Sequence, residues 1–444
     1  MLSAPAPPAL VWLSRAAGLV LFVVVVSLRG GPLSAQNDAR AVTFPTTAIS
    51  QGNWRLAEQE TTVPDPPGYP MLAAPLVELF RPVIGSPVWC SSRALPAGVA
   101  GGPQAAFYRS VLHQCTSQRS GQRRALPPWY RSQAVLGVLA WLVVLAGTQL
   151  LLRAVHRRPT AAEAAAALAL AILPASSDAL VESFHPQDLL SVGLSCAALA
   201  QCLRRRWLAA GVLLGVAMLS KQFAVLVLIP AVASAPSARA RLRVAGSALM
   251  VASAATAPLW LSDPTATWHA LSATYAAGAG IIRSSTAIGL LGISEVLKLE
   301  VARDAPVLLS ALMCLVVRWR LGKALFAPVP LVGLTLACLA TRLVLEVAMY
   351  EYYFLAVGVF LLVLDLAVGR LPLPSLVWVV GTRYGVVPMA SVAGPGWVAA
   401  AFLISSVVAL GIGLGAVSSP PGRRAVDPVG RSCSDDELVA LPAR

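Results

Sequence analysis

Apolar runs of helix length recur along most of the chain and are separated by short polar stretches. A helix that crosses a bilayer needs about 20 mainly apolar residues. On this basis we predict spans at residues 10–28, 133–152, 161–177, 188–203, 207–220, 222–234, 244–261, 305–317, 324–342, 353–369, 371–390 and 396–417. The pattern therefore predicts an all-α polytopic membrane protein with about 12 transmembrane helices, within a range of roughly 10 to 13.

The same pattern divides the chain into four segments. Residues 1–28 contain the first transmembrane helix, residues 29–132 form a long extracytoplasmic loop with interfacial helices such as 71–80, and residues 133–417 form a multi-helix domain. Residues 418–444 are rich in Pro, Gly and charge, which is typical of a disordered tail. The first apolar run lacks a basic n-region, so a retained span is favoured over a cleaved signal peptide.

Composition agrees with membrane insertion. The chain is 57% hydrophobic and only 12% charged, whereas soluble domains are about 25% charged. The net charge of +14 would suggest nucleic acid in a soluble protein, but no basic run carries interleaved aromatic residues. Nucleic-acid binding is therefore not expected.

Arginine placement predicts the orientation. Lys and Arg accumulate in cytoplasmic loops, and six basic groups fall on one side when the spans alternate: Arg157–Arg158, Arg204–Arg206, Arg239–Arg243, Arg318–Lys323, Arg370 and Arg423–Arg424. We expect a plasma-membrane protein with both termini in the cytoplasm. Most other ionisable residues then lie outside, so the candidate active site is extracytoplasmic.

Asp38 follows the first span by ten residues. A carboxylate tethered there can reach the headgroup level and accept a proton from an attacking hydroxyl. A solvated loop acid is the simpler alternative.

A second outer group surrounds residues 178–188. Glu182 and His185 are three residues apart, within reach of one another on a helix. With only one His among carboxylates, the group lacks a diagnostic zinc pattern, so no cofactor is predicted and a divalent metal has no support. Binding of a phosphate or of sugar hydroxyls fits Asp188 better, with a helix N-cap as the alternative.

Three cations complete the candidate site. Lys221 separates two apolar runs and could bind a lipid phosphate or snorkel to the headgroups. Arg283 lies in an outer loop, and Arg342 ends a span with Tyr350 and Glu351 beyond it. Arg342 and Glu346 are four apart, so these two residues could instead pair with each other.

Cysteines indicate no metal site. Cys90 and Cys115 share the first loop, where a disulfide or two free thiols are equally compatible with the sequence. The sequence has no P-loop, G-x-S-x-G or Rossmann glycine pattern, so an activated donor would have to arrive in the membrane.

Residues 182–230 resemble a block of the polytopic GT-C glycosyltransferases, closest to glycosyltransferase family 87. This family comprises the actinobacterial polyprenyl-phosphate-dependent mannosyl- and arabinofuranosyltransferases. The similar features are His185-Pro186-Gln187-Asp188, an Arg-rich turn, and the run from Trp207-Leu208 to Ser220-Lys221-Gln222. Asp38, Gly52-Asn53-Trp54 and Gly68-Tyr69-Pro70 resemble the family's first loop. The inserted Gln187 and the segment 83–131 depart from the family pattern.

The resemblance implies a GT-C-like bundle and an inverting transfer of mannose or arabinofuranose. The donor would be a polyprenyl-phosphate sugar, the acceptor a cell-envelope glycan or glycolipid, and the other partners membrane lipids. Asp38 would be the general base, and Lys221, His185 and an Arg would stabilise the departing phosphate. Two other hypotheses remain: a transporter or flippase for a lipid-linked glycan, and a non-catalytic partner in envelope assembly.

Overall fold

The computed structural model describes residues 4–29, 68–84, 128–158, 160–181, 184–262, 294–346, 351–386 and 395–418, with Leu2, Thr46, Ile49, Ile288 and residues 264–265. Every regular element within these ranges is helical. One isolated antiparallel bridge joins Pro5 to Thr160. The predicted all-helical class is therefore confirmed for the described part.

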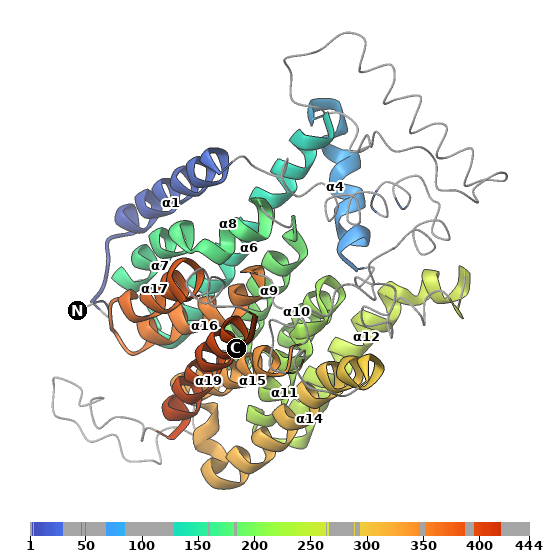
Figure 1. Ribbon diagram of the computed structural model, residues 1–444, viewed down its shortest axis with the longest axis vertical. Helices are drawn as coiled ribbons and strands as arrows, with labels where there is room; N and C mark the ends of the chain where they lie inside the picture. The colour runs from blue at the N-terminus through green and yellow to red at the C-terminus, as the bar shows by residue number, and fades with distance from the viewer. Residues whose placement is uncertain are drawn as a thin grey trace, which may run out of the picture.

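Helices occupy most of the predicted apolar runs, but the helix Glu295–Leu321 begins ten residues before the predicted run 305–317, and the helix Leu373–Val380 covers only part of the run 371–390. Figure 1 shows the arrangement of the helices. Their bounds are α1 (Pro8–Leu28), α4 (Gly68–Ile84), α6 (Pro128–His156), α7 (Ala161–Ile172), α8 (Pro174–Val181), α9 (Pro186–Leu203), α10 (Trp207–Ser220), η2 (Gln222–Ala224), α11 (Val225–Ser234), α12 (Ala238–Ser262), α14 (Glu295–Leu321), η3 (Gly322–Phe326), α15 (Pro328–Val344), η4 (Glu351–Tyr353), α16 (Phe354–Ala367), α17 (Leu373–Val380), η5 (Gly381–Val386) and α19 (Pro395–Ser418).

The predicted count of about 12 spans is not confirmed. Among the described residues, four helices are long and apolar enough to cross a membrane: Pro8–Leu28, Val135–His156, Ala238–Leu261 and Trp397–Ser418. The pair α7 and α8, bent by 43°, would be a fifth. Helices such as α10, with 14 residues, reach only about 21 Å, less than the hydrocarbon core of about 30 Å. The chain is thus a helical protein with several long apolar helices that suit a membrane.

Short turns gather at one end of the bundle. His156 Nε2, at the end of α6, lies 3.1 Å from the carbonyl oxygen of Leu366 in α16. Arg318 donates a hydrogen bond of 3.3 Å from NH1 to the carbonyl of Ala233. We call this the basic end, defined by the turns that carry Arg157–Arg158, Arg204–Arg206 and Arg318–Lys323. The opposite end, where α1, α8, α10 and α15 finish, is called the site end.

Close backbone approaches hold neighbouring helices together. A Cβ atom placed on Gly147 of α6 would lie 2.0 Å from the carbonyl oxygen of Gly193 in α9. A Cβ on Gly413 of α19 would lie 2.7 Å from the carbonyl oxygen of Gly333 in α15. Small residues at helix crossings are typical of membrane bundles, where packing replaces the hydrophobic effect between helices.

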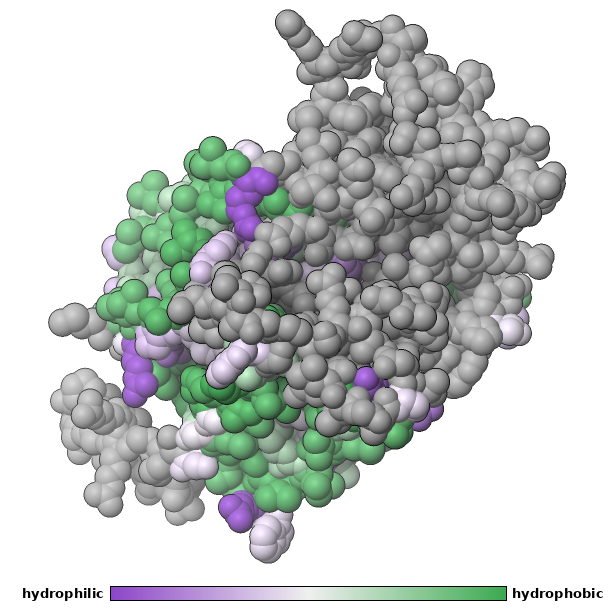
Figure 2. Space-filling model, viewed as in Figure 1, coloured by the Kyte–Doolittle hydropathy of each residue, from purple (hydrophilic) through white to green (hydrophobic). Residues whose placement is uncertain are grey.

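The outward faces are strongly apolar. Figure 2 shows hydrophobic residues covering much of the visible surface of the described helices. Exposed large apolar side chains occur on α1, α12, α14 and α19, and Trp319 is 84% exposed. Such extended patches are unusual on soluble monomers, and this surface fits a lipid environment.

Candidate functional site

Asp188 forms the centre of a buried polar cluster at the site end. It lies in the first turn of α9, only 2% exposed. Its Oδ2 is 3.5 Å from His185 Nδ1 and 3.7 Å from Lys221 Nζ. Lys221 stands at the break between α10 and η2 in an extended conformation, which turns the chain and leaves its ammonium group beside α9. One carboxylate therefore holds two potential cations from different helices.

The loop before α9 fixes the position of His185. Phe184 is fully buried and has a φ of 45°, a conformation that is strained for a bulky residue. The His185 backbone N–H donates to the carbonyl of Ala179 in α8. Gln187 Nε2 lies 2.9 Å from His185 Nδ1. The inserted Gln187 also makes Asp188 the third residue after His185, which allows their side chains to meet.

Aromatic side chains line the other side of the imidazole. The His185 ring stacks on Tyr352, with centroids 4.2 Å apart and planes 15° apart. Tyr352 in turn meets Tyr353 edge-on at 4.8 Å. The Arg342 guanidinium lies over Tyr353 at 4.7 Å and over Phe223 at 5.4 Å. These rings enclose the cluster and strengthen the cation contacts by excluding water.

Arg342 also pairs along its own helix end. Its Nε is 3.3 Å from Glu346 Oε2, as the four-residue spacing predicts. Together with Asp188 and Lys221, this pair gives two carboxylates and two permanent cations among the described residues, so the charges of these four side chains balance. Asp188 Oδ2 receives no hydrogen bond within the described part of the chain, because His185 Nδ1 and Lys221 Nζ lie 3.5 and 3.7 Å away, farther than the usual range of about 2.7–3.2 Å.

A second contact ties α1 to this end. Arg29, the C-cap of α1, donates to Asp178 Oδ1 and, at 2.7 Å, to Ser177 Oγ. Asp178 is buried in α8, one residue before the carbonyl that receives the His185 N–H. The C-terminal end of α1 therefore lies beside the His185 loop.

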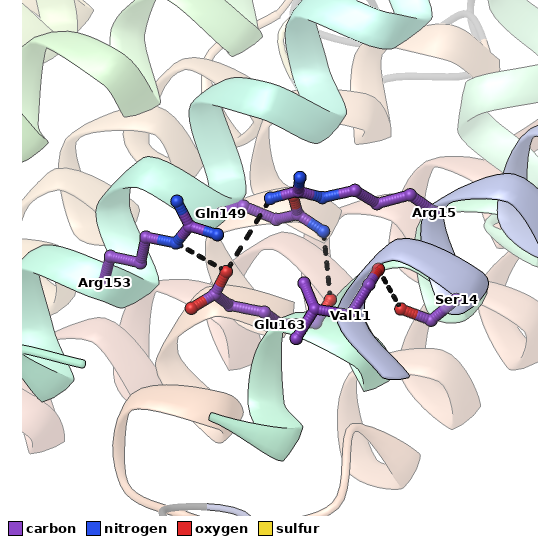
Figure 3. Close-up of polar contacts among 6 residues, drawn as sticks. All are labelled: Val11, Ser14, Arg15, Gln149, Arg153 and Glu163. Atoms are coloured by element: carbon purple, nitrogen blue, oxygen red, sulfur yellow. Dashed lines mark hydrogen bonds and ion pairs between the residues drawn. The ribbon is translucent and has the colours of Figure 1, made fainter. Parts of the chain in front are cut away.

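A separate polar cluster lies at the basic end (Figure 3). Glu163, fully buried in the first turn of α7, accepts a hydrogen bond of 2.7 Å from Arg153 Nε on α6. Arg15 Nη2 on α1 is 4.0 Å from the same carboxylate oxygen. Arg15 Nε also donates to Gln149 Oε1 at 2.7 Å, and Gln149 Nε2 donates to the Glu163 carbonyl at 3.2 Å. Sequence reasoning missed this cluster.

The other predicted site residues belong to segments that the structure does not describe. Asp38, Arg283, Glu182, Tyr350, Cys90 and Cys115 lie outside the described residues, as does the side chain of Glu351. Their roles, and the disulfide, stay predictions. Within the described ranges, no group of three His, Cys, Asp or Glu residues could hold a metal ion.

Comparison with known proteins adds no relative. No protein-family model matches this chain, and no curated protein is significantly similar to it. The geometry of the site and the sequence motifs therefore carry the functional argument.

Proposed function

We propose that this chain is an integral-membrane glycosyltransferase that moves mannose or arabinofuranose from a polyprenyl-phosphate donor to a cell-envelope glycan or glycolipid. The observation that carries the proposal is the meeting of His185, Asp188, Lys221 and Arg342 at one end of an apolar bundle. A buried lysine and a half-buried arginine beside aromatic rings suit a phosphate attached to an apolar chain. The resemblance of residues 182–230 to family 87 supports the same reaction.

In the proposed reaction each charged group has a separate task. Lys221 and Arg342 stabilise the phosphate as the bond from its oxygen to the anomeric carbon breaks. Asp188 orients Lys221 and can accept a hydrogen bond from a sugar hydroxyl at its unsatisfied oxygen. The acceptor oxygen forms the new bond on the opposite face of the sugar, with inversion, and Asp38 takes its proton.

The orientation follows from the distribution of charge. We infer that the basic end faces the cytoplasm, since Lys and Arg are retained on that side of membranes. Both termini are then cytoplasmic, and the site end faces outward. A lipid-linked donor is consistent with this side, where soluble activated sugars are scarce.

Transfer of a labelled sugar tests the proposal. Membranes containing the wild type, Asp38→Asn or Asp304→Asn receive radiolabelled polyprenyl-phosphate mannose or arabinofuranose and endogenous acceptor. Asp304 is the matched control, because it is exposed and pairs only locally with the adjacent Arg303 in the described structure. We expect product from the wild type and Asp304→Asn, and at least about 100-fold less from Asp38→Asn.

Two results would count against the proposal. No product from folded wild-type protein with either donor would exclude these transferase activities. Equal product from Asp38→Asn would leave the transferase in place but remove Asp38 as its base.

A further inference from the structure

The cluster around Glu163 has more positive than negative charge. Arg15 and Arg153 share one carboxylate oxygen of Glu163, at 4.0 and 2.7 Å. Figure 3 shows the two guanidinium groups reaching Glu163 from opposite sides, one from α1 and one from α6. Gln149 is neutral, so two permanent cations face one anion. Counting only the residues that the structure describes, the cluster therefore carries one uncompensated positive charge.

This charge lies where a ligand can reach it. Glu163 is fully buried, but the side chains of Arg15 and Arg153 are 21% and 36% exposed. Arg157 and Arg158, at the end of the same helix as Arg153, are exposed. The partly exposed guanidinium groups have donors left over after their contacts with Glu163 and Gln149.

An apolar surface begins beside these cations. The Arg15 guanidinium lies 4.6 Å from the ring centroid of Trp12, and Trp12 is 66% exposed. Further exposed apolar residues continue along α1, including Leu13, Val20, Val23 and Val24. A Trp beside Arg at the end of an apolar helix is typical of the headgroup level of a bilayer.

We propose that Arg15, Arg153 and Trp12 form a binding site for the headgroup of an anionic glycerophospholipid. The phosphate binds the free donors of the two guanidinium groups and offsets the uncompensated charge. The acyl chains lie along the exposed face of α1. Glu163 holds both guanidinium groups in place, so α1, α6 and α7 present a preformed site. The lipid site does not require transferase activity, since it lies at the opposite end of the bundle from Asp188.

Native mass spectrometry of the full chain released from nanodiscs tests this site. The nanodiscs contain equal amounts of phosphatidylglycerol and phosphatidylcholine, and the measurement is the ratio of the two lipids retained. Arg153→Gln removes the uncompensated charge and still leaves Arg15 to balance Glu163. We expect it to lower the retained ratio about fivefold. Arg243→Gln, an exposed arginine of α12 at the basic end, is the matched control and should leave the ratio unchanged.

A second variant distinguishes loss of lipid binding from misfolding. Trp12→Leu changes an exposed side chain, so the fold should be kept while retention of phosphatidylglycerol falls about twofold. Equal ratios for the wild type, Arg153→Gln and Trp12→Leu would overturn the proposal, as would equal losses in Arg153→Gln and Arg243→Gln. Displacement of the lipid by millimolar glycerol phosphate would also overturn it, because a free phosphate ligand would then be sufficient.

Discussion

The two buried ionic clusters of this bundle are built in different ways. The Glu163 cluster joins α1 to the C-terminal turns of α6 and the first turn of α7, through direct hydrogen bonds of 2.7 Å to Gln149 and Glu163. The Asp188 cluster uses helix ends and breaks, and its charges are 3.5 and 3.7 Å apart. The first arrangement fixes three helices against one another and leaves both guanidinium groups partly exposed, whereas the second leaves its charged groups loosely paired in a buried position.

The surroundings of the Asp188 cluster also have features of a ligand-binding site. Aromatic rings from η2 and η4 enclose the Asp188 cluster, and the strained Phe184 precedes His185. A strained backbone persists only where the surrounding structure stabilises it, and such residues are common at functional sites. The comparison indicates that burial of charge alone does not mark a site, while loose pairing of charge beside a strained backbone favours the Asp188 cluster as the proposed transferase site.

The largest loss of stability is expected from removing Glu163. Glu163→Ala leaves two guanidinium groups facing each other at the junction of three helices. Removing one partner of a buried ion pair costs about 3–5 kcal/mol, and we expect the lower end of this range because both guanidinium groups are partly exposed to solvent. Unfolding in mixed detergent micelles measures the free energy of unfolding. Glu300→Ala, at an exposed acid of α14, should change it by less than about 0.5 kcal/mol. Equal losses would show that the Glu163 cluster does not hold the helices.

A smaller loss of stability is expected from a change at the crossing of α6 and α9, the helices that connect the two clusters. α6 carries Arg153 and α9 carries Asp188, and these helices touch at Gly147 and Gly193. In Gly147→Ala the added methyl group would meet the backbone of Gly193, so we expect a loss of about 1–3 kcal/mol. Gly246→Ala on α12, with no atom within 4 Å of the added group, should be neutral or stabilising. The same unfolding assay compares the two variants. An unchanged free energy of unfolding in Gly147→Ala would show that α6 and α9 do not approach each other this closely.

Apolar periodicity predicted most of the helices well. The predicted run from Trp207 to Ser220 has the same first and last residues as helix α10. Both ends were predictable because charged residues flank the apolar run, Arg204–Arg206 before it and Lys221 after it. Residues 161–177 were predicted as one span, but the chain bends between α7 and α8 at Leu173 and Pro174. Proline lacks the N–H that would continue the helix. Pro174 is therefore the signal in the sequence for this bend.

Long-range polar contacts were harder to predict. The site-end grouping of His185, Asp188 and Lys221 could be expected, because all three fall at neighbouring helix ends. Glu163 resembles an ordinary acid in the first turn of a helix, and its partner Arg15 lies far away in sequence. No local spacing connects these residues. Packing of α1 against α7 brings them together.

Donor-dependent transfer by Lys221→Gln tests the central claim, that the Asp188 cluster is the functional one. Lys323→Gln, an exposed lysine at the basic end, is its matched control. In membranes supplied with the radiolabelled polyprenyl-phosphate sugar, the wild type and Lys323→Gln should give equal product. Lys221→Gln should give about 100-fold less while remaining folded in the unfolding assay. Full transfer by Lys221→Gln would contradict the assignment of the site.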